Sequence, residues 1–178
     1  MKTMNPSMKI NHKYQPSGNS CGPTCLYMAG EYVRNKTFDL PWKNDFPYEI
    51  EQISEMCGTD WIVGTPPDRL EKGMKAIGLR YVEYLASPKP YELLRQIFEI
   101  ENVPILRTIT QGIPHWIIVS ECMITIHESG KISYSKFIVL DPWLGKIEYT
   151  KEQLDAVWKP RNYQLYEILS NDAPIIRF

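Results

Sequence analysis

The first hundred residues place apolar side chains every three or four positions, which is the period of an amphipathic helix. Capping residues and prolines mark where these segments start, and glycine or asparagine marks where they end. The predicted helices cover residues 21–36, 49–57, 65–78 and 87–102, and a strand is predicted over residues 79–85. Residues 38–60 are rich in aromatic residues and contain prolines, so we expect a loop there, with the second of these helices as a short helical part of it. The N-terminal half is therefore predicted to be mainly helical.

In the second half the pattern changes to segments rich in Ile, Val, Tyr and Trp, which strands favour. The predicted strands cover residues 103–109, 115–126, 131–140 and 163–169. A capping-box sequence from Thr150 to Gln153 predicts a short helix before the last strand. Helices followed by an antiparallel sheet define an α+β domain, with the two halves meeting along one face.

The length of 178 residues predicts a single globular domain over residues 1–178. Hydrophobic residues make up 43% of the chain and charged residues 23%, which is enough for a buried core and excludes intrinsic disorder. Residues 1–14 are polar for most of their length, and we expect them to form a flexible N-terminal segment.

The charge balance argues against two classes of partner. Lys and Arg number 20 against 21 for Asp and Glu, so no basic excess attracts nucleic acid or anionic lipid. No apolar run approaches the about 18 residues of a membrane span, and the N-terminus does not resemble a signal peptide. We therefore expect a cytoplasmic protein, and a secreted effector without a leader would have the same sequence features.

Few residues are available for nucleophilic or acid–base chemistry. The cysteines and histidines are Cys21, Cys25, Cys57, Cys122, His12, His115 and His127. Their spacing lacks the paired ligands of a zinc site, so we expect free thiols and neither a metal nor a cofactor. Any mechanism that needs an imidazole base has three candidates.

A predicted hairpin brings His115 near an acidic residue. Residues 128–130 have a turn sequence and separate the two longest predicted strands. Positions whose numbers add to about 258 then face each other, which places His115 within one or two steps of Asp141. A carboxylate beside an imidazole fixes the ring tautomer and favours the protonated ring, as in a catalytic triad. Taken singly, His115 fits a strand-end residue equally well, and Asp141 fits a simple turn.

Cys21 lies where the first helix is predicted to begin. The free N–H groups and the positive dipole of a helix N-terminus stabilise a thiolate, so we expect a reactive cysteine there. Cys25, one turn later, is expected in the core, as are Cys57 and Cys122. Gln15 offers an amide that can join the Cys21 backbone N–H in stabilising an oxyanion.

These residues belong to four short motifs. In chain order, the motifs are Gln15, Cys21-Gly22-Pro23-Thr24, His115-Trp116 and Leu140-Asp141-Pro142-Trp143-Leu144-Gly145. They resemble a papain-like cysteine peptidase, and more closely the stand-alone relatives of the bacteriocin-processing (double-glycine leader) peptidase family. Ser20 stands where the transporter-fused enzymes usually carry an acidic residue, which favours the stand-alone relatives.

The resemblance spans nearly the whole chain and implies a papain-like fold. By resemblance, Cys21 is the nucleophile, His115 the base and Asp141 the orienting acid. Gln15 would then be the oxyanion donor.

The expected function is that of a cysteine peptidase or amide hydrolase that acts on a peptide or protein through a thioester acyl-enzyme. The same thioester also permits transfer to a peptide amine, as in phytochelatin synthases, which share the Cys-Gly-Pro start. Attack on a glutamine side chain would give deamidation. A catalytically idle papain-like module that binds a peptide and an unrelated α+β domain remain alternatives. The substrate and the oligomeric state stay open.

Overall fold

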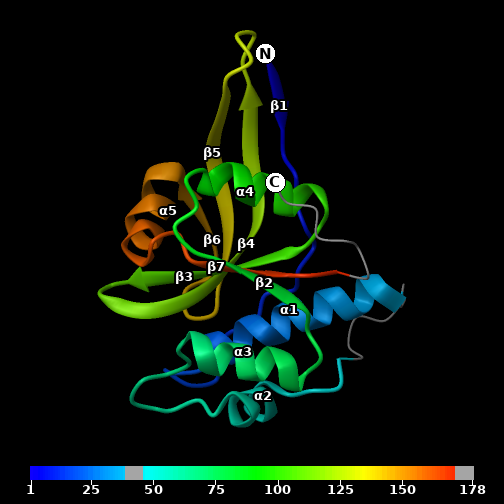
Figure 1. The fold of residues 1–178 in the computed structure, drawn as a ribbon, viewed down its shortest axis with the longest axis vertical. Helices are drawn as coiled ribbons and strands as arrows, with labels where there is room; N and C mark the ends of the chain where they lie inside the picture. Colours follow the sequence, from blue (N-terminus) through cyan, green and yellow to red (C-terminus); the bar gives the residue numbers. More distant parts are fainter. Residues whose placement is uncertain (39–45, 171–178) are drawn as a thin grey trace.

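The computed structural model describes residues 1–38 and 46–170, and the side chains of residues 37 and 38 are not described. Its elements are β1 (Lys2–Met4), α1 (Cys21–Phe38), α2 (Ile50–Cys57), α3 (Pro67–Ala76), β2 (Tyr81–Tyr84), α4 (Pro90–Glu99), β3 (Val103–Thr110), β4 (Ile113–Ile126), β5 (Ile132–Asp141), β6 (Gly145–Thr150), α5 (Lys151–Trp158), the 3-10 helix η1 (Lys159–Arg161) and β7 (Leu165–Ile168). Neighbouring strands are antiparallel throughout the described sheet. The predicted α+β architecture is therefore confirmed (Figure 1).

The three helices α1, α2 and α3 pack together below the sheet in Figure 1. Helix α1 begins at Cys21, as predicted, and continues two residues beyond the expected end at Lys36. Part of the loop predicted after it, residues 39–45, lies outside the described residues. Gly73 allows α3 to approach α2 closely, because a Cβ there would lie 2.2 Å from the Sγ of Cys57.

The sheet has the strand order β2-β7-β3-β4-β5-β6, with β1 added to β4. The β4–β5 hairpin has the predicted register, since Ile118 pairs with Leu140. Strand β6 was not predicted; after the buried Gly145, its other five residues alternate between exposed and partly buried positions. Its position is set by the tight turn after Asp141, which returns the chain along β5.

Helices α4 and α5 contact the sheet through β3, and they contact each other through Tyr91. Tyr91 of α4 packs edge-on against Trp158 of α5, with ring centroids 5.9 Å apart, and its hydroxyl donates to Asp155. The predicted capping box is present, because the Thr150 side chain accepts from the backbone N–H of Gln153. No helix among the described residues has the length and apolar character needed to cross a membrane.

The N-terminal segment does not leave the domain as a free tail, which differs from the expectation for residues 1–14. Strand β3 pairs with β4 only as far as Ile118, so the outer half of β4 has a free edge. Strand β1 pairs with that edge, and Met8 is buried in the core. An edge of unpaired backbone groups attracts an extended segment even when its side chains are polar.

Candidate active site

The β4–β5 hairpin places a histidine beside a buried carboxylate. His115 Nε2 lies 2.8 Å from Asp141 Oδ1, although 26 residues separate them in sequence. The Asp141 side chain is fully buried, and 6% of the His115 side chain is exposed. Such a short contact between buried groups fixes the orientation of the imidazole ring.

The turn between β5 and β6 holds the Asp141 carboxylate in place. Its Oδ1 also accepts the backbone N–H groups of Trp143 at 2.7 Å and Leu144 at 3.0 Å. Burial alone would raise the pKa of Asp141, but the hydrogen bond and charge of His115, together with these N–H groups, lower it. Asp141 is therefore ionised when it contacts His115.

Cys21 is the first residue of α1, and Ser20 precedes it. The Ser20 carbonyl accepts from the backbone N–H of Thr24 at 3.0 Å and from its hydroxyl at 2.7 Å, which anchors the first turn. Gly22 lets this turn approach the neighbouring loop, since a Cβ there would lie 2.9 Å from the Cβ of Thr65. Cys21 is 8% exposed and lines the same cleft as His115, and its thiol is one of the groups that raise the pKa of the His115 ring.

The surroundings of His115 favour its charged form. Burial would lower the pKa of His115, but the hydrogen bonds and charges of Asp141 and Cys21 outweigh it and raise the pKa to about 9. Cys25 behaves differently, because burial raises the pKa of its thiol, with smaller contributions from the charges of Cys21 and Asp141. The imidazolium thus faces Cys21, and Cys25 stays a neutral thiol in the core.

Gln15 lies beside Cys21 and is held by the backbone around it. Its backbone N–H donates to the carbonyl of Pro142 at 2.8 Å, and its Nε2 donates to the carbonyl of Ser17 at 2.6 Å. An amide nitrogen carries two hydrogens, so one N–H of the side chain remains for a ligand. Because the Ser17 carbonyl can only accept, this contact identifies the nitrogen end of the Gln15 amide.

Two residues support this arrangement through contacts that the sequence does not predict. His12 Nε2 lies 2.7 Å from the carbonyl oxygen of Asp141 and donates to it. Trp116 Nε1 donates to the carbonyl of Thr65 at 2.7 Å, which ties β4 to the loop before α3. No local pattern marks either contact, because each joins segments far apart in the sequence. His127, the third histidine, contacts Ser133 near the far end of the hairpin.

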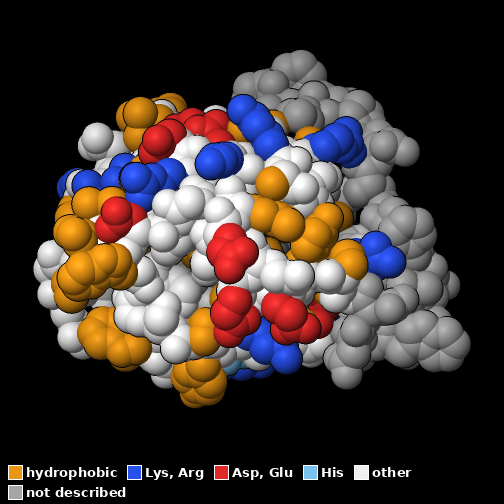
Figure 2. Space-filling model, turned by 90° about the horizontal axis from the view of Figure 1, so that it is seen from below, with side chains coloured by type: hydrophobic (Ala, Val, Ile, Leu, Met, Phe, Trp, Pro, Cys, Tyr) orange, Lys and Arg blue, Asp and Glu red, His pale blue; other side chains and the backbone are white. Residues whose placement is uncertain are grey.

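Cys21, His115 and Gln15 line one cleft with a volume of about 830 Å³. One wall is the turn over residues 61–63, whose side chains are 83%, 75% and 61% exposed. Ile113 and Trp143 contribute further exposed apolar surface. Figure 2 shows apolar side chains gathered along the left margin of the molecule, the side on which the segment between α2 and α3 lies in Figure 1.

The fold is similar to that of solved peptidases. The peptidase domain of Streptococcus ComA, a bi-functional ABC transporter involved in quorum sensing, matches with a TM-score of 0.63 and 15% identity over 91% of this chain and 99% of that one. A double glycine motif protease from an AMS/PCAT transporter, in complex with the leader peptide, matches at 0.62 and 16% identity over 92% and 94%. A candidate C39-like peptidase from Bacillus anthracis matches at 0.64 and 9% identity over 96% and 100%. No family model matches the sequence, and no curated protein does either.

The chain has the papain-like fold of the C39 bacteriocin-processing peptidase domains. Within this C39 peptidase fold, the start of α1 faces the ends of β4 and β5, and the four residues singled out from the sequence lie together there. No group of three or more His, Cys, Asp or Glu side chains in residues 1–38 and 46–170 is arranged to hold a metal ion.

Proposed function

We propose that the chain is a cysteine peptidase or amide hydrolase in which Cys21, His115 and Asp141 act as a catalytic triad. One observation carries the proposal: the His115 ring contacts Asp141 through Nε2 at 2.8 Å and shares a cleft with Cys21, which stands at a helix N-terminus. Both Cys21 and His115 line a cleft that is open to a ligand. A nucleophile, a base and a group that orients the base are the parts that covalent catalysis requires.

Each residue has a separate role. Asp141 accepts the Nε2–H of His115, which leaves Nδ1 for the Cys21 thiol. Because the pKa of His115 is raised to about 9, the ring holds a proton at neutral pH and stabilises the Cys21 thiolate. The dipole and free N–H groups of the first turn of α1 add to this stabilisation.

The reaction begins when the Cys21 thiolate attacks an amide carbonyl carbon and forms a C–S bond. The carbonyl electron pair moves to oxygen, and the Gln15 side chain and the Cys21 backbone N–H donate to that oxyanion. The tetrahedral intermediate collapses, the C–N bond breaks, and the His115 imidazolium gives its proton to the departing amine. The neutral ring then takes a proton from water, whose oxygen attacks the thioester carbon; the C–S bond breaks, the acid is released, and the Cys21 thiolate and the His115 imidazolium are regenerated.

The acceptor of the acyl group decides the overall reaction. Attack by water gives hydrolysis, whereas attack by a peptide amine gives transfer through the same thioester. When the attacked amide is a glutamine side chain, hydrolysis gives deamidation. A peptide substrate is supported by the exposed apolar walls of the cleft and by the leader peptide bound to one of the similar structures. We therefore infer a peptide or protein as the acyl donor.

The test is site-resolved alkylation of the native protein. Limiting iodoacetamide is applied from about pH 5 to 9, and labelling of all four cysteines is mapped on peptides. Cys21 should label fastest and keep its reactivity in mildly acidic buffer, because the imidazolium maintains the thiolate. Burial raises the pKa of Cys57 and Cys122 to about 12, so these two thiols serve as slow internal references.

Matched variants separate the nucleophile from its neighbour. Cys21→Ala should abolish cleavage of a proteome-derived peptide mixture without unfolding the protein, and His115→Ala should remove the acid-stable labelling of Cys21. Cys25→Ala, one turn further along α1, should retain both properties. The proposal is wrong if Cys21→Ala cleaves as well as the unmodified chain, or if Cys25→Ala abolishes cleavage in a folded protein. Ordinary thiol reactivity at Cys21 would favour a peptide-binding module.

A further inference from the structure

One arginine lines the catalytic cleft, and its side chain is charged at every pH at which the protein is folded. Arg107 lies on β3, and its Cα pairs with that of Trp116 on β4, one position from the pair formed by Thr108 and His115. Among the described residues that line the cleft, Arg107 is the one lysine or arginine, and none is aspartate or glutamate. The remaining walls are largely apolar.

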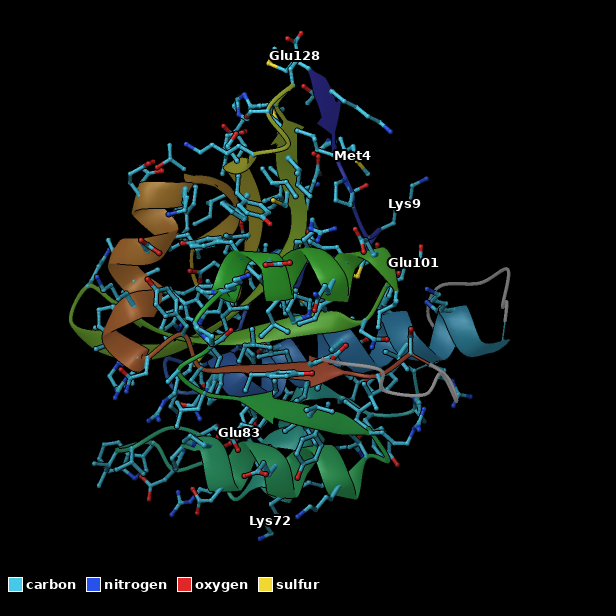
Figure 3. The ribbon with its side chains drawn as sticks, turned by 45° about the horizontal axis from the view of Figure 1, so that its top comes forward. Met4, Lys9, Lys72, Glu83, Glu101 and Glu128 are labelled. Carbon is cyan, nitrogen blue, oxygen red and sulfur yellow. The ribbon has the colours of Figure 1, made fainter. Side chains whose placement is uncertain are left out.

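Arg107 has no carboxylate partner in the part of the chain that the structure describes. None of the ion pairs among these residues includes it. Its Nη1 donates to Gln164 Oε1 at 3.2 Å, and Gln164 Nε2 donates in turn to Glu83 Oε1 at 3.0 Å. The neutral amide of Gln164 therefore stands between the guanidinium and the carboxylate of Glu83, which lies on β2 beside α3 (Figure 3).

The surroundings of Arg107 destabilise its positive charge when no ligand is bound. Arg107 is half-buried, and burial together with the positive charge of Arg161 lowers its pKa. An arginine nevertheless stays protonated in a protein, so the charge persists. A guanidinium has five N–H donors in a planar fork, and one of them is used by Gln164. The free donors match the two oxygens of a carboxylate.

We propose that Arg107 binds a carboxylate of the peptide substrate and thereby selects acidic peptides. The inference rests on the proposed function, because the carboxylate is carried by the peptide that occupies the cleft of Cys21. Two sources have the same chemistry: an Asp or Glu side chain near the scissile amide, and the C-terminal carboxylate of a short peptide. In the apolar surroundings of the cleft, one charge-assisted pair of this kind gives about tenfold selectivity or more.

The experiment measures binding apart from catalysis. The full-length Cys21→Ala protein is mixed with a randomised library of acetylated decapeptides, in free-acid and C-terminally amidated forms, and the bound peptides are sequenced by mass spectrometry. The expected result is enrichment of Asp or Glu at one position in both forms, or enrichment of the free-acid form alone. Matched peptides with Glu or Gln at that position, or with an acid or amide C-terminus, should then differ about tenfold or more in affinity.

Substitutions assign the preference to one side chain. Arg107→Met should reduce the affinity ratio of the matched peptides to about one, and Arg107→Lys should retain part of the ratio, because it keeps the charge without the fork. Arg161→Gln removes the neighbouring charge outside the cleft lining and should keep most of the preference. Thermal unfolding of each variant shows whether it is folded, and the lysine variant supplies the comparison if the methionine variant is not.

Three outcomes overturn the inference. They are binding without acid preference, an acid preference that survives in folded Arg107→Met, and no binding of any peptide. If the unmodified protein cleaves peptides without acid preference, the role of Arg107 is wrong and the proposed peptidase function stands. If Cys21→Ala selects acidic peptides and the unmodified protein cleaves none of them, the role of Arg107 stands and the proposed function fails.

Discussion

At the scale of single residues, His115 links the stability of the fold to its chemistry. Its pKa is raised from 6.5 to about 9, because the contacts with Asp141 and Cys21 outweigh the effect of burial. The folded chain therefore holds this proton more tightly than the unfolded chain does. The stabilisation is fully present below about pH 6.5 and is lost as the pH rises through about 9. The same interval limits the imidazolium form that the proposed mechanism uses.

Replacing Asp141 by asparagine should move this titration. Asparagine keeps the size of the side chain and removes the negative charge, so the pKa of His115 should fall from about 9 toward its ordinary value of about 6.5. An NMR titration of the His115 ring, with His12 and His127 as the other two signals, measures the midpoint directly. The alkaline limb of peptide cleavage should move to lower pH with it, and partial activity should remain because Asp141 orients the ring without reacting. An unchanged midpoint in a folded variant would show that Asp141 does not control the proton.

At the scale of elements, local patterns predicted most of the fold and long-range contacts supplied the rest. The helices and the β4–β5 register followed from periodicity, capping residues and one turn sequence, and this register brought His115 to Asp141. Strand β6 was missed because it is short: only five residues alternate between Gly145 and the capping box at Thr150. The contacts of His12 and of the Gln15 backbone with the β5–β6 turn depend on where the N-terminal segment runs, which no local pattern encodes.

The packing of α3 on α2 gives a test at this scale. Alanine usually stabilises a helix interior relative to glycine by about 1 kcal/mol. At Gly73, however, the added Cβ would lie 2.2 Å from Cys57 Sγ, so Gly73→Ala should lower the free energy of unfolding by about 1 to 3 kcal/mol. Urea denaturation measures the change. In a Cys57→Ala background the contact with Sγ is absent and the nearest remaining atom is Leu26 Cδ1 at 3.0 Å, so Gly73→Ala should lower the stability by clearly less. Equal losses in both backgrounds would exclude the Sγ contact as the cause.

At the scale of the whole molecule, the N-terminal segment connects the projecting end of the hairpin to the candidate active site. Figure 3 shows Met4 alongside the hairpin and Glu128 at its tip. From there the segment buries Met8 and reaches the end of β5, where His12 contacts the Asp141 carbonyl and Gln15 contacts that of Pro142. The anchor of the segment is therefore Met8, and the residues that touch the site follow it.

Two changes in this segment should differ strongly in their effect on stability. Removal of residues 2–5 takes away β1, whose side chains are exposed, and should change stability little while Cys21 alkylation stays fast. Met8→Ala removes a side chain that is 6% exposed and should cost about 2 to 5 kcal/mol. Urea denaturation and alkylation rates of both variants provide the comparison. If removing residues 2–5 slows Cys21 alkylation as much as His115→Ala does, the pairing of β1 with β4, and not Met8, holds the segment against the site.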